Sequence, residues 1–254
     1  MKIVRFIHDN IVSYGVLSHN TIRLIEGSIY EDYQELPVEF NLDQIKLLSP
    51  CEPSKIICIG LNYRDHALEV GLPIPKWPVI FMKPSTAVIG PEQNIIYPTY
   101  FVNRVDYEAE LGVVIKKKAK NVDEEDALNY VLGYTCANDV TARNLQPKEG
   151  QWTAAKSFDT FMPLGPVIAT DISPHNLNIT CTVNGEIKQK SNTSNFIFPV
   201  PYLVSYISKI MTLLPGDVII TGTPSGISPV HSGDIITISI DGIGDLTNKI
   251  VKEC

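Results

Sequence analysis

The hydrophobic pattern of the first part of the chain predicts short β strands. β-like runs at residues 2–7, 11–17 and 21–25 are separated by polar breaks. Short runs of this kind, bounded by polar turn residues, are typical of strands in a small sheet. We therefore expect a small β-rich N-terminal domain at residues 1–50.

A second and larger domain, residues 51–254, is predicted to begin with a buried strand. Pro50 and Pro53 precede the run Lys55-Ile-Ile-Cys-Ile-Gly60, which is mostly apolar and ends at a glycine. A continuous apolar run of this length indicates a strand that is covered on both faces. Residues 79–83 predict another strand.

Two segments carry start and stop signals of helices. Residues 62–71 end at a glycine, which favours a short helix or helical turn. Residues 123–133 begin with Asp123 as a capping residue, continue with acids in the first turn and end at Gly133. Both segments are predicted to be helical.

A third helix is predicted from periodicity at residues 202–214. Apolar side chains recur there at helical spacing, and Pro215-Gly216 follow as a stop signal. Ser205, Ser208 and Lys209 fall on the opposite face, which we expect to be solvated.

Hairpin signals surround these helices and decide the expected fold class. Asn184-Gly185 and Asp241-Gly242 each lie between apolar runs, where such pairs favour tight turns. Strands outnumber helices and do not alternate regularly with them. The pattern therefore predicts an α+β fold with a mixed, mostly antiparallel β roll rather than a doubly wound sheet.

Length and charge narrow the class of partner. The 254 residues suffice for one large domain with a small appendage, and 21 Lys plus Arg against 28 Asp plus Glu give a formal charge of −7. An acidic balance argues against a broad surface for nucleic acid or anionic membrane. We expect a small-molecule partner.

The lack of an apparent targeting signal and the pattern of cysteines favour a reducing compartment. The N-terminus lacks the apolar run of a signal peptide, and no run reaches the roughly 18 apolar residues of a membrane span. Five cysteines, at positions 51, 58, 136, 181 and 254, contain no Cys-x-x-Cys pair. We expect a soluble, cytoplasmic protein with free thiols.

Three acids form a candidate metal site. Glu108 and Glu110 project from the same face if their segment is a strand, and Asp139 follows a later apolar run. Adjacent carboxylates on a buried segment need a cation, a shared proton or a ring of donors. Mg²⁺ or Mn²⁺ suits this oxygen set better than structural zinc does. Solvated acids, or acids paired with basic residues such as Arg143, are the alternative.

Arg143 lies four residues after Asp139 and would share its face if residues 140–145 were helical.

His66 and Glu69 form a second candidate constellation. At a spacing of three on one helical turn, the carboxylate can orient the imidazole and raise its basicity, so that the pair can activate water. A surface His–Glu contact is the competing interpretation.

Lys156 lies among small and aromatic residues. Burial there would demand a carboxylate partner or a lowered pKa, and either would suit a lysine that holds an anionic substrate. A lysine that extends along the rim into water is the alternative.

The loop Thr221-Gly-Thr-Pro-Ser-Gly226 follows an apolar strand. Its hydroxyls and amides can bind a carboxylate, but the segment lacks the Gly-Lys-Ser/Thr ending of a phosphate-binding loop, so nucleotide binding is not expected. The loop also makes sense as a structural turn alone.

Taken together and in this order, these segments resemble the fumarylacetoacetate hydrolase family, in particular its smaller acylpyruvases, oxaloacetate decarboxylases and hydroxyheptadienedioate isomerases. The similarity runs from about Lys55 to Lys249, and the N-terminal unit is similar to the small β domain of many members. Its six motifs are Gly60-Leu-Asn-Tyr-Arg-Asp-His66, Phe81-Met-Lys-Pro84, Tyr107-Glu-Ala-Glu-Leu-Gly112, Asn138-Asp-Val-Thr-Ala-Arg143, Ala155-Lys-Ser-Phe158 and Gly216-Asp-Val-Ile-Ile-Thr-Gly-Thr-Pro-Ser-Gly226.

The resemblance implies the family's mixed β roll of the fumarylacetoacetase C-terminal type, assembled as a homodimer. It also implies that Glu108, Glu110 and Asp139 bind Mg²⁺ or Mn²⁺. His66 and Glu69 would then form a water-activating dyad on a mobile lid.

The same resemblance assigns the remaining site residues. Lys156 would stabilise an enolate, Arg143 and Gln146 would contact the carboxylate and keto oxygens of the substrate, and Thr223 would contact its carboxylate. Lys83 falls in a family motif without a firm role, and Asp65 is expected to act behind the residues that contact the ligand.

The sequence therefore predicts a metal-dependent enzyme that acts on an enolisable 2-oxo acid, most readily by C–C bond hydrolysis or decarboxylation. Residues 144–155 are shorter than in acylpyruvase-like members, and residues 157–166 are more similar to the isomerase group. Isomerisation of 2-hydroxyhepta-2,4-diene-1,7-dioate is therefore the main alternative. From other classes, a metal-dependent phosphoesterase or nuclease and a non-catalytic binding protein stay open.

Overall fold

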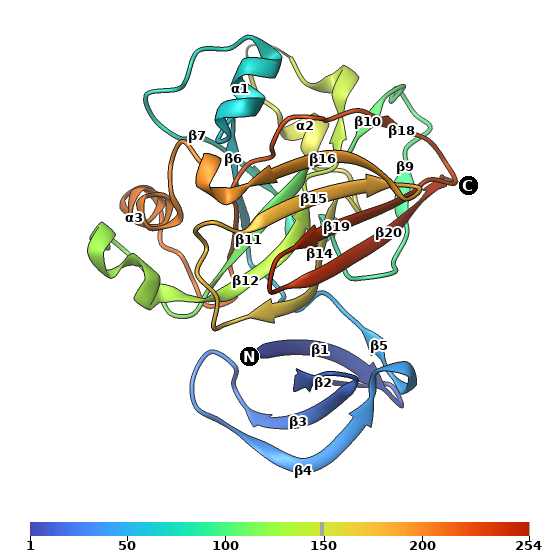
Figure 1. The fold of residues 1–254 in the computed structure, drawn as a ribbon, viewed down its shortest axis with the longest axis vertical. Helices are drawn as coiled ribbons and strands as arrows, with labels where there is room; N and C mark the ends of the chain where they lie inside the picture. Colours follow the sequence, from blue (N-terminus) through green and yellow to red (C-terminus); the bar gives the residue numbers. More distant parts are fainter. Residues whose placement is uncertain (148–149, 254) are drawn as a thin grey trace.

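Strands dominate the computed structural model, which describes residues 1–147 and 150–253. Figure 1 shows a small group of N-terminal strands beside a larger, strand-rich body with few helices. The predicted α+β class with mostly antiparallel pairing is confirmed. The helices among the described residues are α1 (Arg64–Val70), α2 (Thr153–Lys156) and α3 (Val200–Ile210), with 3₁₀ turns η1 (Leu42–Gln44), η2 (Ser85–Ala87), η3 (Glu124–Tyr130), η4 (Arg143–Leu145) and η5 (Thr193–Asn195).

The largest sheet among the described residues has 12 strands. Two short strands lie off its main path, β5 (Lys46–Leu47) beside β1 and β8 (Val88–Ile89) beside β14. The path itself runs in the order β4 (Tyr33–Asn41), β3 (Thr21–Gly27), β2 (Ile11–Ser18), β1 (Lys2–His8), β14 (Met162–Ala169), β12 (Val131–Asn138), β11 (Ala109–Ile115), β17 (Val218–Ile220), β6 (Ile56–Gly60) and β7 (Val79–Lys83).

The three predicted N-terminal strands are confirmed, and β4 is a fourth that the pattern did not reveal. These strands are not isolated from the rest, because β1 pairs with β14 through Lys2–Ala169 and Ile3–Ile168. The large sheet thus passes from the N-terminal strands into the larger body. The division into domains at residue 50 stays a prediction.

Strand β11 occupies the centre of the larger body (Figure 1). Every residue of β11 is buried, as expected for a strand that is apolar on both faces. Its antiparallel pairing with β12 sets Ala109 opposite Asn138. The residues that flank this pair, Glu108 and Glu110 on one side and Asp139 on the other, are therefore brought together by strand register.

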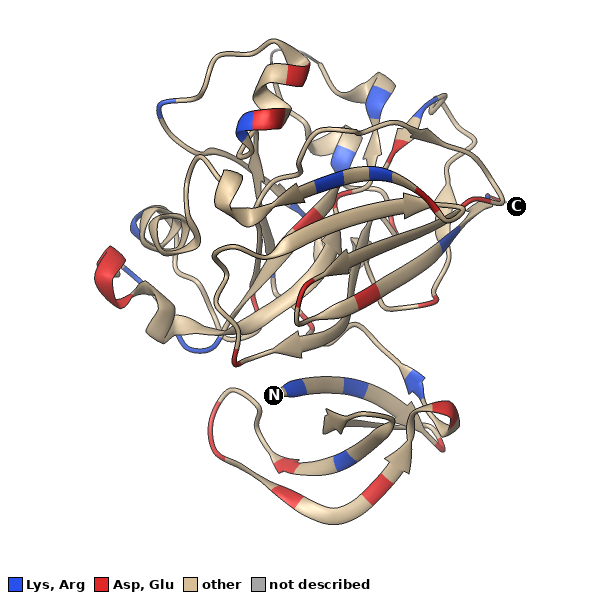
Figure 2. Cartoon of the chain, viewed as in Figure 1, with Lys and Arg blue, Asp and Glu red and all other residues tan. Residues whose placement is uncertain are grey.

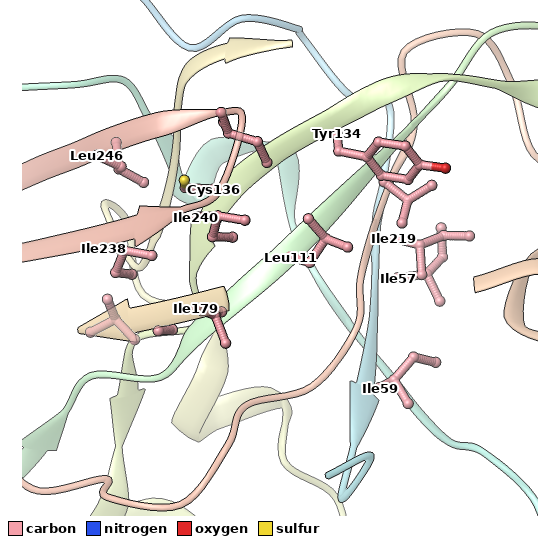
Figure 3. Packing of buried hydrophobic residues seen from close by; sticks show 14 of the residues in the cluster. Ile57, Ile59, Leu111, Tyr134, Cys136, Ile179, Ile219, Ile238, Ile240 and Leu246 are labelled. Carbon is pink, nitrogen blue, oxygen red and sulfur yellow. The ribbon is translucent and has the colours of Figure 1, made fainter. Parts of the chain in front are cut away.

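A five-stranded sheet covers the central strands, in the order β16 (Glu186–Asn192), β15 (Asn178–Val183), β19 (Ile235–Ile240), β20 (Gly244–Lys252) and β9 (Ile95–Tyr97). Both predicted hairpins lie in it. Asn184 and Gly185 have φ of 52° and 82°, the positive values that a tight two-residue turn requires. Figure 3 shows Ile179, Ile238 and Leu246 of this sheet in the buried cluster that also contains Leu111 and Cys136 of the central strands.

A short three-stranded sheet, β13 (Thr141–Ala142), β10 (Val105–Asp106) and β18 (Pro229–Val230), lies next to the ends of the central strands. Residues 141–142 are therefore extended, and the helix considered for residues 140–145 is wrong except for the η4 turn. Arg143 directly follows β13, as the first residue of η4.

The helix predicted at residues 123–133 is wrong at its C-terminal end. A 3₁₀ turn ends at Tyr130, and Gly133 lies inside β12 rather than stopping a helix. A Cβ on Gly133 would lie 2.5 Å from the carbonyl oxygen of Ala169. The glycine is needed there because β12 and β14 approach closely, not because a helix ends.

Helix α3 begins two residues earlier than predicted and ends at Ile210. Ser205 and Ser208, which the pattern placed on the wet face, are buried. Ser205 Oγ donates to the carbonyl of Val122 at 2.8 Å, and Ser208 Oγ accepts from its N–H at 2.9 Å. The serines face the segment that precedes η3, and their hydroxyls satisfy its backbone.

The remaining sequence predictions concern the surface and the cysteines. Cys51, Cys58, Cys136 and Cys181 are free and buried, while Cys254 lies outside the described residues. Acidic and basic positions are interspersed in both parts of the chain (Figure 2). Within the described residues, none of the helices has the length and apolar character needed to span a membrane.

Candidate metal and substrate site

Three buried carboxylates form the centre of the candidate site. Oxygens of Glu108, Glu110 and Asp139 all lie within 4.8 Å of one another. Glu110 belongs to β11, Glu108 precedes it, and Asp139 follows β12, with its N–H donating to the carbonyl of Glu108 at 2.9 Å. The structure thus brings the three predicted metal ligands together.

Glu110 is the least neutralised of the three. It is 1% exposed, and its Oε2 accepts the backbone N–H of Gly222 at 2.6 Å. Burial, with Asp139 and Glu108 nearby, raises the pKa of Glu110 well above its usual range. A buried carboxylate of this kind is stabilised by a proton or a cation, and the three-oxygen donor set suits a hard divalent ion. The residues present therefore fit Mg²⁺ or Mn²⁺.

Glu108 is held as an anion by basic neighbours. Its Oε2 accepts from Lys156 Nζ at 2.9 Å, and its Oε1 accepts from Thr141 Oγ1 at 3.1 Å and from Arg143. Burial alone would raise the pKa of Glu108, but the charges of Lys156 and Arg143 hold it well below its usual range. The alternative of acids paired with bases therefore holds for Glu108 alongside its place in the cluster.

Lys156 is buried at 1% exposure, so the interpretation as a rim lysine that reaches water is wrong. Its Nζ donates to Glu108 and, at 2.5 Å, to Asp139 Oδ2, and lies 5.0 Å from the centre of the Phe81 ring. Burial alone would lower the pKa of Lys156, but Asp139 and Glu108 raise it. The lysine therefore stays charged next to the acids.

Lys83 approaches the same aspartate from the other side. Its Nζ donates to Asp139 Oδ1 and, at 2.9 Å, to the carbonyl of Val140. The side chain is fully buried, and burial lowers its pKa despite the aspartate. Lys83 and Lys156 thus hold the two oxygens of Asp139 in fixed directions.

Arg143 joins two acids and a predicted substrate-binding residue. Its Nε donates to Asp106 Oδ2 at 2.8 Å, its Nη2 to Glu108 and its Nη1 to Gln146 Oε1. Asp106 is buried and also accepts from Arg104 at 2.8 Å. Sequence reasoning missed Asp106, although its spacing of two from Glu108 was a usable signal.

The predicted dyad lies on α1. His66 Nδ1 is 2.9 Å from Glu69 Oε2, while Glu69 Oε1 accepts the N–H of Gly226 at 2.9 Å. The His66 side chain is 12% exposed, whereas Glu69 is exposed, so the pair lies at the surface with its imidazole mostly covered. Asp65 stands behind it and accepts from Ser191 Oγ at 2.6 Å. The helix is thereby tied to loop 221–226 and to β16.

Loop 221–226 connects the parts of the site. Its Gly222 N–H binds Glu110, its Gly226 N–H binds Glu69, and Thr223 between them is buried. Gly222 has φ of 94°, and a Cβ on it would lie 2.8 Å from Asn62 Cβ, so only glycine fits this turn. Sequence reasoning missed Gln189, whose Nε2 donates to Thr223 Oγ1 at 2.8 Å.

Three buried carboxylates whose geometry fits a divalent ion thus lie at the ends of the central strands, in contact with a buried lysine, and loop 221–226 joins them to a His–Glu pair. Residues 55–251 match the family described as fumarylacetoacetate (FAA) hydrolase C-terminal, and residues 1–50 match Rv2993c-like, N-terminal. The chain belongs to the fumarylacetoacetate hydrolase family.

Relatives with assigned names are similar over most of the chain. Oxaloacetate tautomerase fahd2, mitochondrial, from Xenopus laevis is 48% identical over 220 residues, which are 82% of this chain and 69% of that protein. The structure of 2-hydroxyhepta-2,4-diene-1,7-dioate isomerase from Mycobacterium marinum is 39% identical with a TM-score of 0.93, and the alignment covers 100% of this chain and 99% of that one.

A third relative was solved with a ligand. Maleylpyruvate hydrolase from Sphingobium sp. SYK-6, in complex with manganese(II) ion and pyruvate, is 30% identical with a TM-score of 0.84, and the alignment covers 100% of both chains. The family membership and the type of fold predicted from the sequence are confirmed.

Proposed function

We propose that this protein catalyses proton transfer on an enolisable 2-oxo dicarboxylic acid of the oxaloacetate type, with Mg²⁺ or Mn²⁺ held by Glu108, Glu110 and Asp139. The sequence alone favoured hydrolysis or decarboxylation. Isomerisation now comes first because relatives at 48% and 39% identity are named a tautomerase and an isomerase. The observation that carries the proposal is the buried Lys156, which bridges two of the three carboxylates.

The charge balance of the site supports a doubly charged substrate. Three acids at the site form ion pairs with four bases, and Glu110, which a bound cation would favour as an anion, is the fourth acid, so that the formal charges cancel. A divalent ion adds two positive charges to this set, and a dicarboxylate with two negative charges restores the balance. The acids are Asp106, Glu108, Glu110 and Asp139, and the bases are Lys83, Arg104, Arg143 and Lys156.

The protein's own groups are placed to position such a substrate. A bound divalent ion would supply a Lewis acid for the 2-oxo oxygen of the substrate. Arg143 and Gln146 lie in contact and offer polar groups to its carboxylate, as does Thr223 in loop 221–226. Lys156 can donate to the oxygen on which negative charge develops.

The dyad supplies the proton transfer. His66 Nε2 takes a proton from C3 of the substrate, and the C–H electron pair forms the C2–C3 double bond while the C2 oxygen becomes negative. The imidazolium then gives its proton to that oxygen, directly or through water, which forms the enol and returns His66 to its neutral form, and the reverse steps return the keto form. Glu69 accepts from His66 Nδ1 and stabilises the imidazolium that forms.

Hydrolysis or decarboxylation at the same site is the second candidate. The maleylpyruvate hydrolase relative holds manganese and pyruvate, the 2-oxo acid that C–C hydrolysis of maleylpyruvate would release. In that case His66 would take a proton from water, and the hydroxide would attack the carbonyl carbon at C4 while the C3–C4 bond breaks. An enolate on the 2-oxo half is common to both reactions.

The alternatives from other classes have less support. Two-metal phosphoesterases need a second set of acids, and within residues 1–147 and 150–253 the acids, histidines and cysteines form one cluster of metal-binding geometry. A non-catalytic role leaves the buried lysine and the dyad unexplained. We retain the sequence-based proposals of a small-molecule partner, no nucleic-acid or membrane partner, a homodimer and a cytoplasmic location.

The test follows the enol absorbance of oxaloacetate with Mg²⁺, with Mn²⁺ and with a chelator. Release of CO₂ and of pyruvate is measured in parallel to separate the three reactions. We expect metal-dependent acceleration of tautomerisation, lost in Glu110→Gln and retained in the exposed control Glu31→Gln. Full activity in the chelator or in Glu110→Gln would refute the proposal.

A further inference from the structure

Gln189 joins the strand of the metal ligands to the loop of Thr223. It belongs to β16, is 1% exposed, and makes three hydrogen bonds. Its Oε1 accepts the N–H of Ala109 at 2.9 Å, between the two glutamates. Its Nε2 donates to Thr223 Oγ1 and to the carbonyl of Pro224, each at 2.8 Å.

The two backbone contacts fix which way the amide points. The N–H of Ala109 can only donate, and the carbonyl of Pro224 can only accept, so a flipped amide would oppose like groups at both places. The second N–H of Gln189 must therefore point at Thr223 Oγ1. The Thr223 hydroxyl is thereby forced to accept from Gln189, which leaves its own O–H free to donate elsewhere.

The free O–H of Thr223 is available to donate to a ligand. Among the hydrogen bonds of the described residues, none takes the Thr223 hydroxyl as a donor. The hydroxyl is buried beside Gly222, whose N–H binds Glu110. The hydroxyl therefore belongs to the residue next to one that binds a carboxylate of the metal cluster.

We propose that Gln189 is a positioning residue that makes Thr223 a hydrogen-bond donor toward the substrate. The inference rests on the proposed function, in which Thr223 contacts the substrate carboxylate. It adds that this position selects a hydrogen-bond acceptor, such as a carboxylate or carbonyl oxygen, over an ammonium or amide N–H group, which can only donate.

Gln189→Glu provides the sharpest variant. The introduced carboxyl group still accepts from Ala109, but toward Thr223 and the carbonyl of Pro224 it offers an oxygen instead of an NH₂; if this oxygen is protonated, its proton points at Pro224, and toward Thr223 it still accepts. The Thr223 hydroxyl then donates to that carboxylate and is lost to the substrate. Gln189→Met removes both the amide oxygen and the amide NH₂. The Thr223 hydroxyl is then free to rotate, so the loss of substrate affinity is predicted to be smaller than in Gln189→Glu.

The experiment measures binding of Mn²⁺ and then of pyruvate, as the smallest 2-oxo acid, to the Mn²⁺-loaded protein. In Gln189→Glu we expect Mn²⁺ affinity within about 2-fold of the parent and pyruvate affinity lower by about 10- to 100-fold, the range for a hydrogen bond to a charged group. Thr223→Val is expected to lose as much, and the double variant no more than either. Thr223→Ser keeps the hydroxyl and should bind pyruvate normally.

The exposed control Gln44→Glu makes the same change of charge far along the chain and should alter neither affinity. Unchanged pyruvate affinity in Gln189→Glu, a loss in Gln189→Met as large as in Gln189→Glu, or additive losses in the double variant would overturn the role of Gln189 while the proposed function stands. Failure of the parent protein to bind Mn²⁺ or pyruvate would instead refute the proposed function and this inference with it.

Discussion

Lys156 Nζ lies 2.5 Å from Asp139 Oδ2, and both side chains are buried. The ammonium also pairs with Glu108, so one lysine contacts two acids of the metal cluster, beside Lys83 at Asp139 and Arg143 at Glu108. A divalent ion in the same cluster would also neutralise part of this negative charge. The lysine and the ion are therefore expected to substitute for one another in stability but not in catalysis.

Lys156→Met is predicted to destabilise the metal-free protein by about 3 kcal/mol, because Glu108 and Asp139 each lose one of two basic partners and keep only Arg143 and Lys83, respectively. Saturating Mn²⁺ should recover part of this loss, while turnover stays about 100-fold or more below the parent. Chemical unfolding with and without Mn²⁺ and an oxaloacetate assay measure the two effects.

The exposed Lys190→Met serves as the control and should change neither quantity. A metal-free variant as stable as the parent would contradict the assignment of Lys156 as the neutralising partner.

Glu69→Gln is predicted to block the dyad through the histidine tautomer. Glu69 Oε1 accepts from Gly226, so the substituted amide keeps its oxygen there and turns its NH₂ toward His66 Nδ1. The imidazole then carries its proton on Nε2 and no longer acts as a base. We expect turnover to fall about 100-fold or more with Mn²⁺ affinity unchanged.

Glu69→Asp keeps the carboxylate charge but shortens the side chain, so it tests whether the charge or the length of the side chain matters. Nitrogen-15 NMR of the histidine ring reports the tautomer directly. An Nε2–H imidazole already present in the parent, or full turnover in Glu69→Gln, would exclude His66 as the general base.

The centre of the fold could be predicted because its signals are local. The apolar runs of β6 and β11, the turn residues Asn184-Gly185 and the period-two spacing of Glu108 and Glu110 each act over a few residues. Glycine was the misleading signal at position 133, where it relieves a contact between strands rather than ending a helix. Local sequence does not distinguish these two uses.

The network around the site could not be predicted to the same extent. Gln189 lies 80 residues from Ala109 and 34 from Thr223 along the chain, and its strand, Glu186-Ile-Lys-Gln-Lys-Ser-Asn192, lacks the apolar alternation that marks a buried face. Lys83 and Asp139 are 56 residues apart. Which polar side chain is buried depends on strand register across the sheets, and that is a property of the whole fold.

Gly133→Ala tests the corrected secondary structure. A Cβ would meet the carbonyl oxygen of Ala169 at 2.5 Å and Ile168 Cγ2 at 2.8 Å, so β12 and β14 would have to separate. We expect a loss of about 2–3 kcal/mol in the free energy of unfolding. In a helix C-cap the same substitution would cost about 1 kcal/mol.

Gly185→Ala is the matched control, because its Cβ meets nothing within 4 Å and only the positive φ of 82° opposes it. Its predicted cost is about 1 kcal/mol. Urea unfolding of both variants provides the comparison, and equal losses would argue against the close approach of β12 to β14.

Stability at alkaline pH is predicted to depend on Cys51. Burial raises the pKa of its thiol from 9.0 to about 12. Above about pH 9 the unfolded chain releases this proton while the folded chain keeps it, so the group's contribution to stability is complete below that pH and falls as pH rises toward 12. The slope for one such group approaches 1.4 kcal/mol per pH unit. Urea unfolding at pH 8.5 and 10.5 should show a smaller decline in the free energy of unfolding for Cys51→Ala than for the parent. The difference in slope corresponds to the release of up to about one proton on unfolding. Equal declines would show that this thiol has the same pKa in the folded and unfolded chain.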